Sequence, residues 1–253
     1  MRLKYIHIVL LCILALAGCG ENAPDCLQSS GKTVEVELDV PSFERITVFE
    51  RIRLVLRQGP QQEVRVQTGE NLLPEISATV VDGTLELRNE NTCNLFRSYG
   101  NTTIWVTVPD LSEVRSSTGL PIVSEGPLGF TDLRLISESF QNEETETTDG
   151  TFDLELSGGR VRVVSNGIAY FRLRGTASLL EVRVAAGDSR VEAGGLQAGI
   201  VRIDHRGSNA MEVYPTDRIE GVIRGYGDVR AFNRPDEISV EELFRGRLLF
   251  VGE

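Results

Sequence analysis

The chain has 253 residues, of which 41% are hydrophobic and 25% charged, and its formal net charge is −11 at pH 7. A protein this acidic is a poor candidate for binding nucleic acid or for inserting into anionic lipid. Both functions need surface clusters of Lys and Arg. No nucleic-acid partner is therefore expected.

Residues 1–18 have the pattern of a secretory signal peptide. A basic start at residues 1–4 precedes an apolar run at residues 5–17, which is short for a membrane span. The stretch LAGC at positions 16–19 resembles the lipobox of bacterial lipoproteins at all four positions. This resemblance implies cleavage before Cys19 and acylation of that cysteine. The alternative is an ordinary signal peptide with Cys19 near its cut.

Residues 19–32 are polar and read as a short tether behind the lipid. Removal of residues 1–18 takes away Arg2 and Lys4 and no acidic residue, so the mature chain has a charge of −13. Acyl chains on Cys19 would then hold the protein to a membrane. Gly20 stands where Asp would favour retention in the inner membrane, so we expect the outer membrane. Whether the protein faces the periplasm or the outside stays open.

Cys26 and Cys93 are the two cysteines left once Cys12 is placed in the signal peptide and Cys19 on the lipid. Export to an oxidising compartment predicts a disulfide between them, worth roughly 4 kcal/mol in the chain-entropy model. The alternative is two free, buried cysteines. Neither has a Cys or His at the spacing of a zinc site, so no metal and no cofactor are expected.

Residues 33–102 read as a β-rich N-terminal part. Apolar and polar residues alternate there with a period of two, which is typical of strands with one buried face. Asp82-Gly83 predicts a tight hairpin. Strands are expected at residues 34–40, 46–49, 52–57, 63–67, 78–81, 84–88 and, at the start of the next region, 103–108.

Residues 103–235 contain a short motif repeated roughly every 20 residues. One apolar series comprises Val161/Val163, Val182/Val184, Val201/Ile203 and Val222/Ile223. A second comprises Phe171/Leu173, Val191/Ala193, Met211/Val213 and Val229/Ala231, and traced backwards it takes in Leu154/Leu156, Leu133/Leu135 and Val114. Strands repeated in this way bury their apolar faces by stacking on one another. We therefore predict an all-β fold whose main part is a β-solenoid with rungs of roughly 20 residues.

One copy of the repeat is missing, and the chain continues beyond the last copy. The acidic run at residues 142–149 stands where a strand is due near residue 143. It is interpreted as a solvated loop or a weakly paired outer strand, with a calcium site as a minor alternative. Residues 236–253 are expected to form a strand or cap at the open end of the stack.

The order of several motifs resembles the head GIN domain family over roughly residues 33–235. The motifs are FERITV at 43–48, RLVLRQG at 53–59, GENLLP at 69–74, VDGTLEL at 81–87 and NTCNLFRSY at 91–99. That family consists of exported bacterial proteins, many of them lipoproteins, described as auto-transporter adhesins. The resemblance implies a right-handed β-helix-like fold and a cell-envelope setting, and it supplies no catalytic residues.

The residues themselves offer little catalytic chemistry. His205 is the only histidine of the mature chain, no Gly-x-Ser-x-Gly motif is present, and we interpret His205 as an exposed polar residue. Arg162, Arg183 and Arg202 could align on successive rungs and hold an acidic glycan by bidentate contacts. The plainer interpretation is that outward faces are polar and that opposite charges on neighbouring rungs attract modestly.

These patterns favour a lipid-anchored envelope protein without catalysis that binds a glycan or a protein. A stack of strands provides a stiff surface suited to many weak contacts. One alternative is a polysaccharide lyase or hydrolase, which would need carboxylates converging in a groove. Another is a structural or assembly component of the envelope.

Overall fold

The computed structural model describes residues 29–91 and 100–252, and this part of the chain is all β. Its only helical element is a single 3-10 turn, η2 (Leu73–Glu75). The predicted all-β class is confirmed. No helix in the described ranges has the length and apolar character to cross a membrane.

Eighteen strands follow one another along the described chain. The first nine are β1 (Thr33–Glu37), β2 (Arg45–Val48), β3 (Arg53–Gln58), β4 (Glu63–Gly69), β5 (Ile76–Val81), β6 (Thr84–Asn89), β7 (Thr103–Val108), β8 (Glu113–Ser116) and β9 (Pro121–Ser124). The others are β10 (Asp132–Ser137), β11 (Thr151–Ser157), β12 (Arg160–Ser165), β13 (Tyr170–Val184), β14 (Arg190–His205), β15 (Met211–Ile223), β16 (Val229–Ala231), β17 (Glu237–Glu242) and β18 (Leu248–Phe250).

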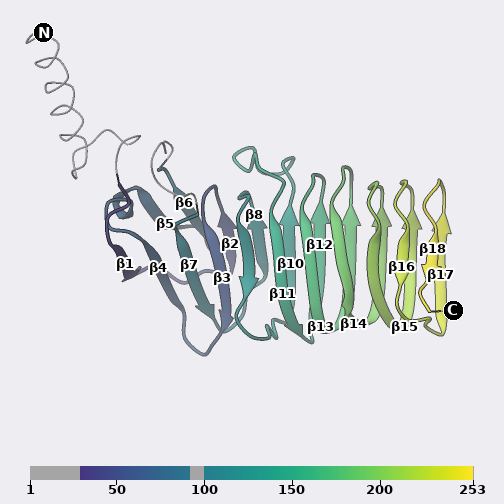
Figure 1. Cartoon of the computed structure of the whole chain (residues 1–253). Coiled ribbons are helices and arrows are strands. Elements are labelled where there is room, and N and C mark those ends of the chain that lie inside the picture. The colour runs from purple at the N-terminus through teal and green to yellow at the C-terminus, as the bar shows by residue number, and fades with distance from the viewer. Residues whose placement is uncertain (1–28, 92–99, 253) are drawn as a thin grey trace, which may run out of the picture.

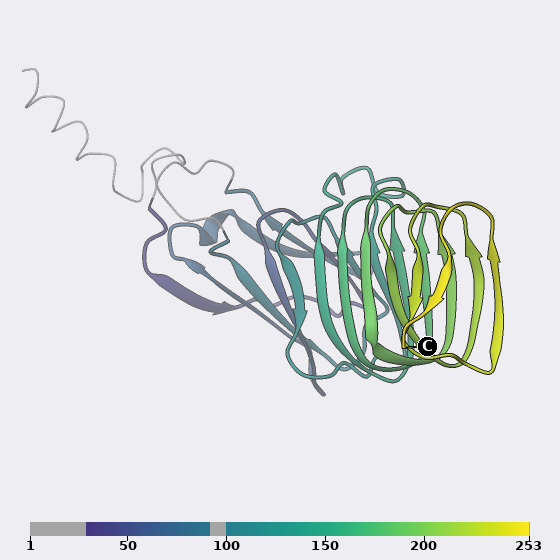
Figure 2. The ribbon, with the colours of Figure 1, turned by 45° about the vertical axis from the view of Figure 1, so that its right-hand side comes forward.

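Parallel pairing stacks most of these strands into two layers, with consecutive stretches of chain alternating between them (Figure 1, Figure 2). The first layer runs β7-β3-β9-β11-β13-β14-β15-β16-β18. The second layer runs β6-β2-β8-β10-β12-β13-β14-β15-β17. The long strands β13, β14 and β15 bend and contribute to both layers. Together the strands form one large hydrogen-bonded sheet.

The second apolar series is confirmed in the first layer. Phe171, Val191, Met211 and Val229 are register partners on successive strands, as the predicted period requires. Phe152 precedes them and Leu248 of β18 follows them in the same register. Residues 237–250 are thus a further copy of the repeat.

The first apolar series is partly out of register. Val161 and Val163 pair with Leu180 and Val182 on β13, and not with the predicted Val182 and Val184. On β15 the partners of Val201 and Ile203 are Ile219 and Gly221, whereas the predicted Val222 pairs with Asp204. Because apolar and polar residues alternate with a period of two, positions two residues apart look alike in sequence. Gly221, the true partner of Ile203, has no apolar side chain that would mark it as an inward position.

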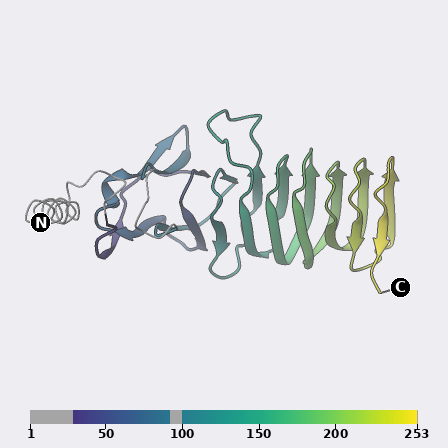
Figure 3. The same ribbon diagram turned by 45° about the horizontal axis from the view of Figure 1, so that its top comes forward.

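The insertion at residues 138–150 explains a second error. It lies between Ile122 and its register partner Phe152, and it separates them by more than one repeat of chain. Leu133 and Leu135 therefore belong to the second layer with Val161 and Val163, while Leu154 pairs with Leu173 in the first. The loop projects from the stack in Figure 3, and no strand is assigned within it.

Parallel stacking also begins earlier than residue 103. β2 lies between β6 and β8, and β3 lies between β7 and β9, so this early segment is inserted between later ones. Among the described strands, antiparallel pairing is confined to pairs that involve β1, β4 and β5, at the N-terminal end of the stack. Residues 33–102 are therefore continuous with the repeats that follow.

The apolar side chains of both layers point inward and form one core cluster. Phe152 and Phe171 on neighbouring strands stack with ring centroids 4.9 Å apart and planes 7° from parallel. Such stacking adds to the gain from burial. The core is thus a set of side-chain columns that run along the stack.

Candidate binding surface

Outward side chains of the second layer form rows that cross the strands. One row contains Arg134, Arg162, Glu181, Arg202 and Glu220 as successive register partners. The Arg202 Nε atom is 2.5 Å from Glu220 Oε1, and Arg162 Nη2 donates to Asp132 Oδ1 at 2.8 Å. Glu220 has a lowered pKa, chiefly because it accepts this hydrogen bond from Arg202.

The structure does not place Arg162, Arg183 and Arg202 in one row. Arg162 and Arg202 share a row with Glu181 between them, whereas Arg183 pairs with Val164 and Asp204 in the next row. The cause is the two-residue register error in the first apolar series. A three-arginine ladder was therefore the wrong prediction, and the actual row alternates in sign from β12 to β15.

A groove of about 640 Å³ lies between the β5–β6 hairpin and the insertion loop. Its floor carries outward residues of the second layer, and the loop forms one wall. The lining includes Arg45, Thr84, Glu113, Arg134 and Asn142. The Arg45 Nε atom donates to Thr84 Oγ1 at 3.0 Å, so part of the floor is already held in place.

A buried ion pair fixes the base of the insertion loop. Arg115 Nη1 donates to Glu138 Oε1 at 2.6 Å, and the two side chains are 8% and 7% exposed. The other carboxylate oxygen accepts the backbone N–H groups of Phe140 and Gln141. Burial alone would raise the pKa of Glu138, but the hydrogen bonds from Arg115 and the two backbone groups outweigh it and lower the pKa.

The insertion loop presents an aromatic ring to solvent. Phe140 is 83% exposed, the highest value among the exposed large hydrophobic residues of the described chain. By contrast, Thr145 is fully buried and its hydroxyl donates to the carbonyl oxygen of Asn142. The loop is thus anchored at its base, while the ring of Phe140, close to that base, stays unpacked. Sequence periodicity offered no means to predict this arrangement.

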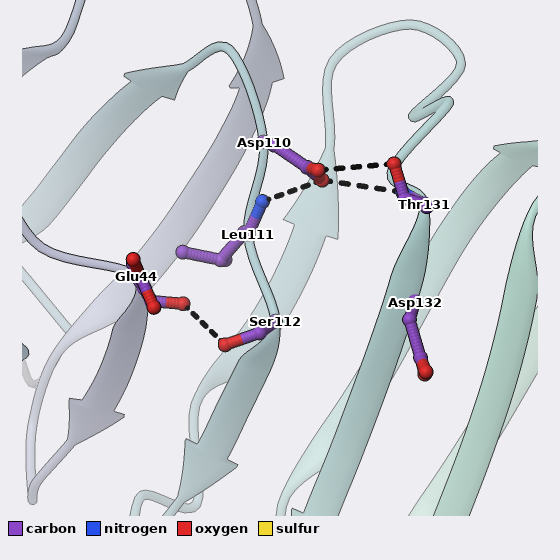
Figure 4. A pocket seen from close by; sticks show the side chains of 6 residues that line it. All are labelled: Glu44, Asp110, Leu111, Ser112, Thr131 and Asp132. Carbon is purple, nitrogen blue, oxygen red and sulfur yellow. Dashed lines mark hydrogen bonds between the residues drawn. The ribbon is translucent and has the colours of Figure 1, made fainter.

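A smaller hollow of about 240 Å³ lies where β2, β8 and β10 begin (Figure 4). Three carboxylates line it, but they do not converge. Asp110 accepts hydrogen bonds from the backbone of Leu111 and from Thr131, and Asp132 is turned towards the arginines of β12. These contacts tie neighbouring turns together and leave no free pair of acids at this place.

The prediction that His205 is exposed is wrong. Its side chain ends β14 on the inward side and is 1% exposed. Nε2 lies 2.9 Å from the carbonyl oxygen of Asn209, while Nδ1 has no partner among the described residues. Burial lowers the pKa of His205, and the nearby Asn209 and Asp204 oppose this only in part.

Stability should fall in mild acid because of this histidine. The unfolded chain takes up a proton near pH 6.5, whereas folded His205 resists it, so stability is lost as the pH falls below about 6.5, by up to about 1.4 kcal/mol per pH unit. His205→Gln keeps a donor for the carbonyl oxygen of Asn209 and should reduce the dependence of the free energy of unfolding on pH. Urea unfolding at pH 7.0 and 5.5 measures this dependence for the parent protein and for the variant. Equal slopes would show that folded His205 takes up the proton as readily as the unfolded chain.

The predicted lipid and disulfide cysteines, Cys19, Cys26 and Cys93, lie outside the described residues. The acidic run at 142–149 is described, and in the described ranges no group of three His, Cys, Asp or Glu is placed to hold a metal ion. Glu144 of this run pairs with Arg88 of β6 instead.

A family model described as "Putative auto-transporter adhesin, head GIN domain" matches residues 42–235. Among solved structures, a putative adhesin from Bacteroides fragilis is 20% identical with a TM-score of 0.73, covering 87% of this chain and 97% of its own. A putative lipid binding protein and a putative adhesin from Parabacteroides distasonis are 16% and 15% identical, with TM-scores of 0.58 and 0.57. They cover 87% of this chain and 97% and 98% of their own. No curated protein matches. The solved structures share the fold of this chain.

Proposed function

The chain belongs to the head GIN domain family of putative auto-transporter adhesins, and on that premise we propose that it is a non-catalytic binding module of the bacterial cell envelope. The observation that carries the proposal is the outward surface of the stack. Its charges stand in ordered rows across hydrogen-bonded strands, as in the row from Arg162 to Glu220. A surface of this kind suits repeated weak contacts with a glycan or a protein.

The stacked strands are proposed to form a right-handed β-solenoid with rungs of roughly 20 residues. The parallel register from Phe152 to Leu248 supports this interpretation. In a stack of this kind each rung is stabilised by its neighbours, so the spacing between outward side chains is fixed along its length. A polymer with a regular repeat could then contact several rungs at once.

The carboxylate arrangement favours binding over polysaccharide cleavage. A glycosidase needs two carboxyl groups facing each other across the bond that is cut. Here, Asp153 contacts Arg172 and Arg174, and Asp132 contacts Arg160 and Arg162. These carboxylates are paired with arginines and do not form the opposed pair that such cleavage needs.

The protein is further proposed to be anchored to the outer membrane by acyl chains on Cys19. We expect Cys19→Ser to move the protein from the membrane fraction to the soluble fraction, because a single substitution removes the site of lipid attachment. Blotting of both fractions measures the change. Substitution of Cys12, in the apolar signal segment, is the matched control and should leave the protein with the membrane.

Treatment of intact cells with a protease that does not enter them tests the adhesive function. If the module binds outside partners, the band of the parent protein disappears while a periplasmic control protein stays intact. Full protection would overturn an adhesive role and would favour an assembly component that faces the periplasm.

A further inference from the structure

Three arginines surround the carboxylate of Asp204 on the outer side of the second layer. The Nε atoms of Arg183, Arg206 and Arg224 lie 3.8, 3.7 and 3.6 Å from its oxygens. Arg183 is on β13, Arg206 follows β14 directly and Arg224 follows β15. The C-terminal ends of three neighbouring strands thus bring three positive charges to one negative charge.

These arginines differ from most others on the surface. None of their guanidinium groups makes a hydrogen bond to another described residue, whereas Arg162 and Arg202 donate to Asp132 and Glu220 at 2.5–3.1 Å. Their side chains are 43–59% exposed, so their donors are open to solvent. The cluster has two more positive than negative charges, in a chain that is acidic overall.

Arg206 and Arg224 lie beside each other directly after two adjacent strands, β14 and β15. His205 pairs with Ile223, so the next residues of the two strands are neighbours as well. Like charges in such positions repel and lower stability. A bound anion between the arginines would relieve this repulsion, and guanidinium groups bind oxyanions through paired N–H donors.

A shallow hollow of about 570 Å³ adjoins the cluster. Its lining is mainly polar and includes Arg202, Asp204, Glu220, Ser239 and Glu241. Carboxylates and a hydroxyl are suitable partners for the hydroxyl groups of a sugar ring. The arginines and the hollow together therefore match a sugar that carries an anionic group.

We propose that Arg183, Arg206 and Arg224 form a binding site for an acidic glycan, which places its sulfate, phosphate or carboxylate group between them. The proposal rests on the binding function proposed above and names its ligand class. Asp204 holds the three side chains together in the free protein and competes with the incoming anion.

Isothermal titration of the purified mature chain with four probes tests the site. The probes are a sulfated hexasaccharide, an oligogalacturonate and a neutral maltohexaose of equal length, and inorganic phosphate. We expect the acidic sugars to bind and the neutral sugar not to bind. Binding should weaken steadily as salt is added, because dissolved ions screen the exposed charges. Vesicles of phosphatidylglycerol distinguish a lipid headgroup as the source of the anion.

Two variants and one control locate the binding. Arg206→Gln with Arg224→Gln should weaken acidic-glycan binding about tenfold or more, since two charge-assisted contacts are lost. Asp204→Asn should strengthen it severalfold, because the competing carboxylate is gone. Arg160→Gln makes an equal change of charge per residue on the same layer and should have no effect. Thermal melts confirm that each variant is folded.

Other results would overturn the proposal. These are an absence of binding to every acidic probe, unchanged binding in the double arginine variant, an equal loss in Arg160→Gln, or a preference for lipid vesicles over acidic sugars. The protease experiment on intact cells is independent of all of them. A surface-exposed protein that fails these titrations would retain its proposed binding role and lose only this ligand site.

Discussion

Glu138→Ala is expected to lower the free energy of unfolding by about 3–5 kcal/mol, because it removes the carboxylate that is hydrogen-bonded to the buried Arg115 guanidinium and leaves only the longer contact with Glu113. Arg115 and Glu138 are 8% and 7% exposed, so water cannot replace the lost partner without a rearrangement. The substitution also removes the acceptor for the backbone N–H groups of Phe140 and Gln141. Urea unfolding followed by circular dichroism measures the change.

An exposed ion pair provides the matched control for this prediction. Glu125 contacts Arg57 at the same distance of 2.6 Å, but its side chain is 56% exposed. Glu125→Ala should therefore cost only about 0–1 kcal/mol. If both substitutions cost the same, the pair at the base of the insertion loop would have no special role in stability.

The same variant should release the loop itself. Hydrogen exchange of residues 138–149 is expected to accelerate in Glu138→Ala, while exchange in β13 and β14 changes little, since each strand of the stack is supported by its own neighbours. Uniform acceleration across the chain would contradict local anchoring of the loop and would indicate general loss of structure.

The apolar period predicted the stack well where the repeat is regular. In the column formed by Phe171, Val191, Met211 and Val229 each inward position is apolar, so alternation and spacing together determine the register. The predicted register failed at Gly221, because glycine has no side chain to mark the inward position. It also failed across residues 138–150, because this insertion lengthens one repeat and shifts the spacing of the apolar residues. The place of β2 and β3 between later strands depends on long-range pairing, which no local pattern records.

Burial of charged and polar residues was predictable only in part. His205 follows Val201 and Ile203 at inward positions, so strict alternation extended to the next inward position would have found it buried. Arg115 is different, because it follows the inward Val114 and its position is outward. The insertion loop covers it there, and only the folded loop reveals this.

Prediction of the arginine cluster from the sequence likewise depends on the correct register between strands. Arg206 and Arg224 are one step of the repeat apart, and this spacing was available from the sequence. Asp204 and Arg183 join them only with the correct pairing of β13 and β14. The register error placed Arg183 beside Arg162 and Arg202 and so hid the true neighbours.

Phe171→Ala is expected to destabilise the protein by about 3–5 kcal/mol, because it opens a cavity in a column of side chains that cannot collapse easily. Phe171 is fully buried and stacks on Phe152 of the adjacent strand. Phe140→Ala makes the same chemical change at an 83% exposed position and should alter stability by less than about 0.5 kcal/mol. Urea unfolding of both variants measures the difference.

A double-mutant cycle with Phe152→Ala separates stacking from simple burial. Because the two rings touch across neighbouring strands, their coupling should be about 0.5–1.5 kcal/mol. Phe152 and Leu248 belong to the same inward column but lie several strands apart, so a cycle between them should show coupling near zero. Strong coupling over that distance would contradict a stack stabilised by adjacent strands and would require the whole column to respond as one unit.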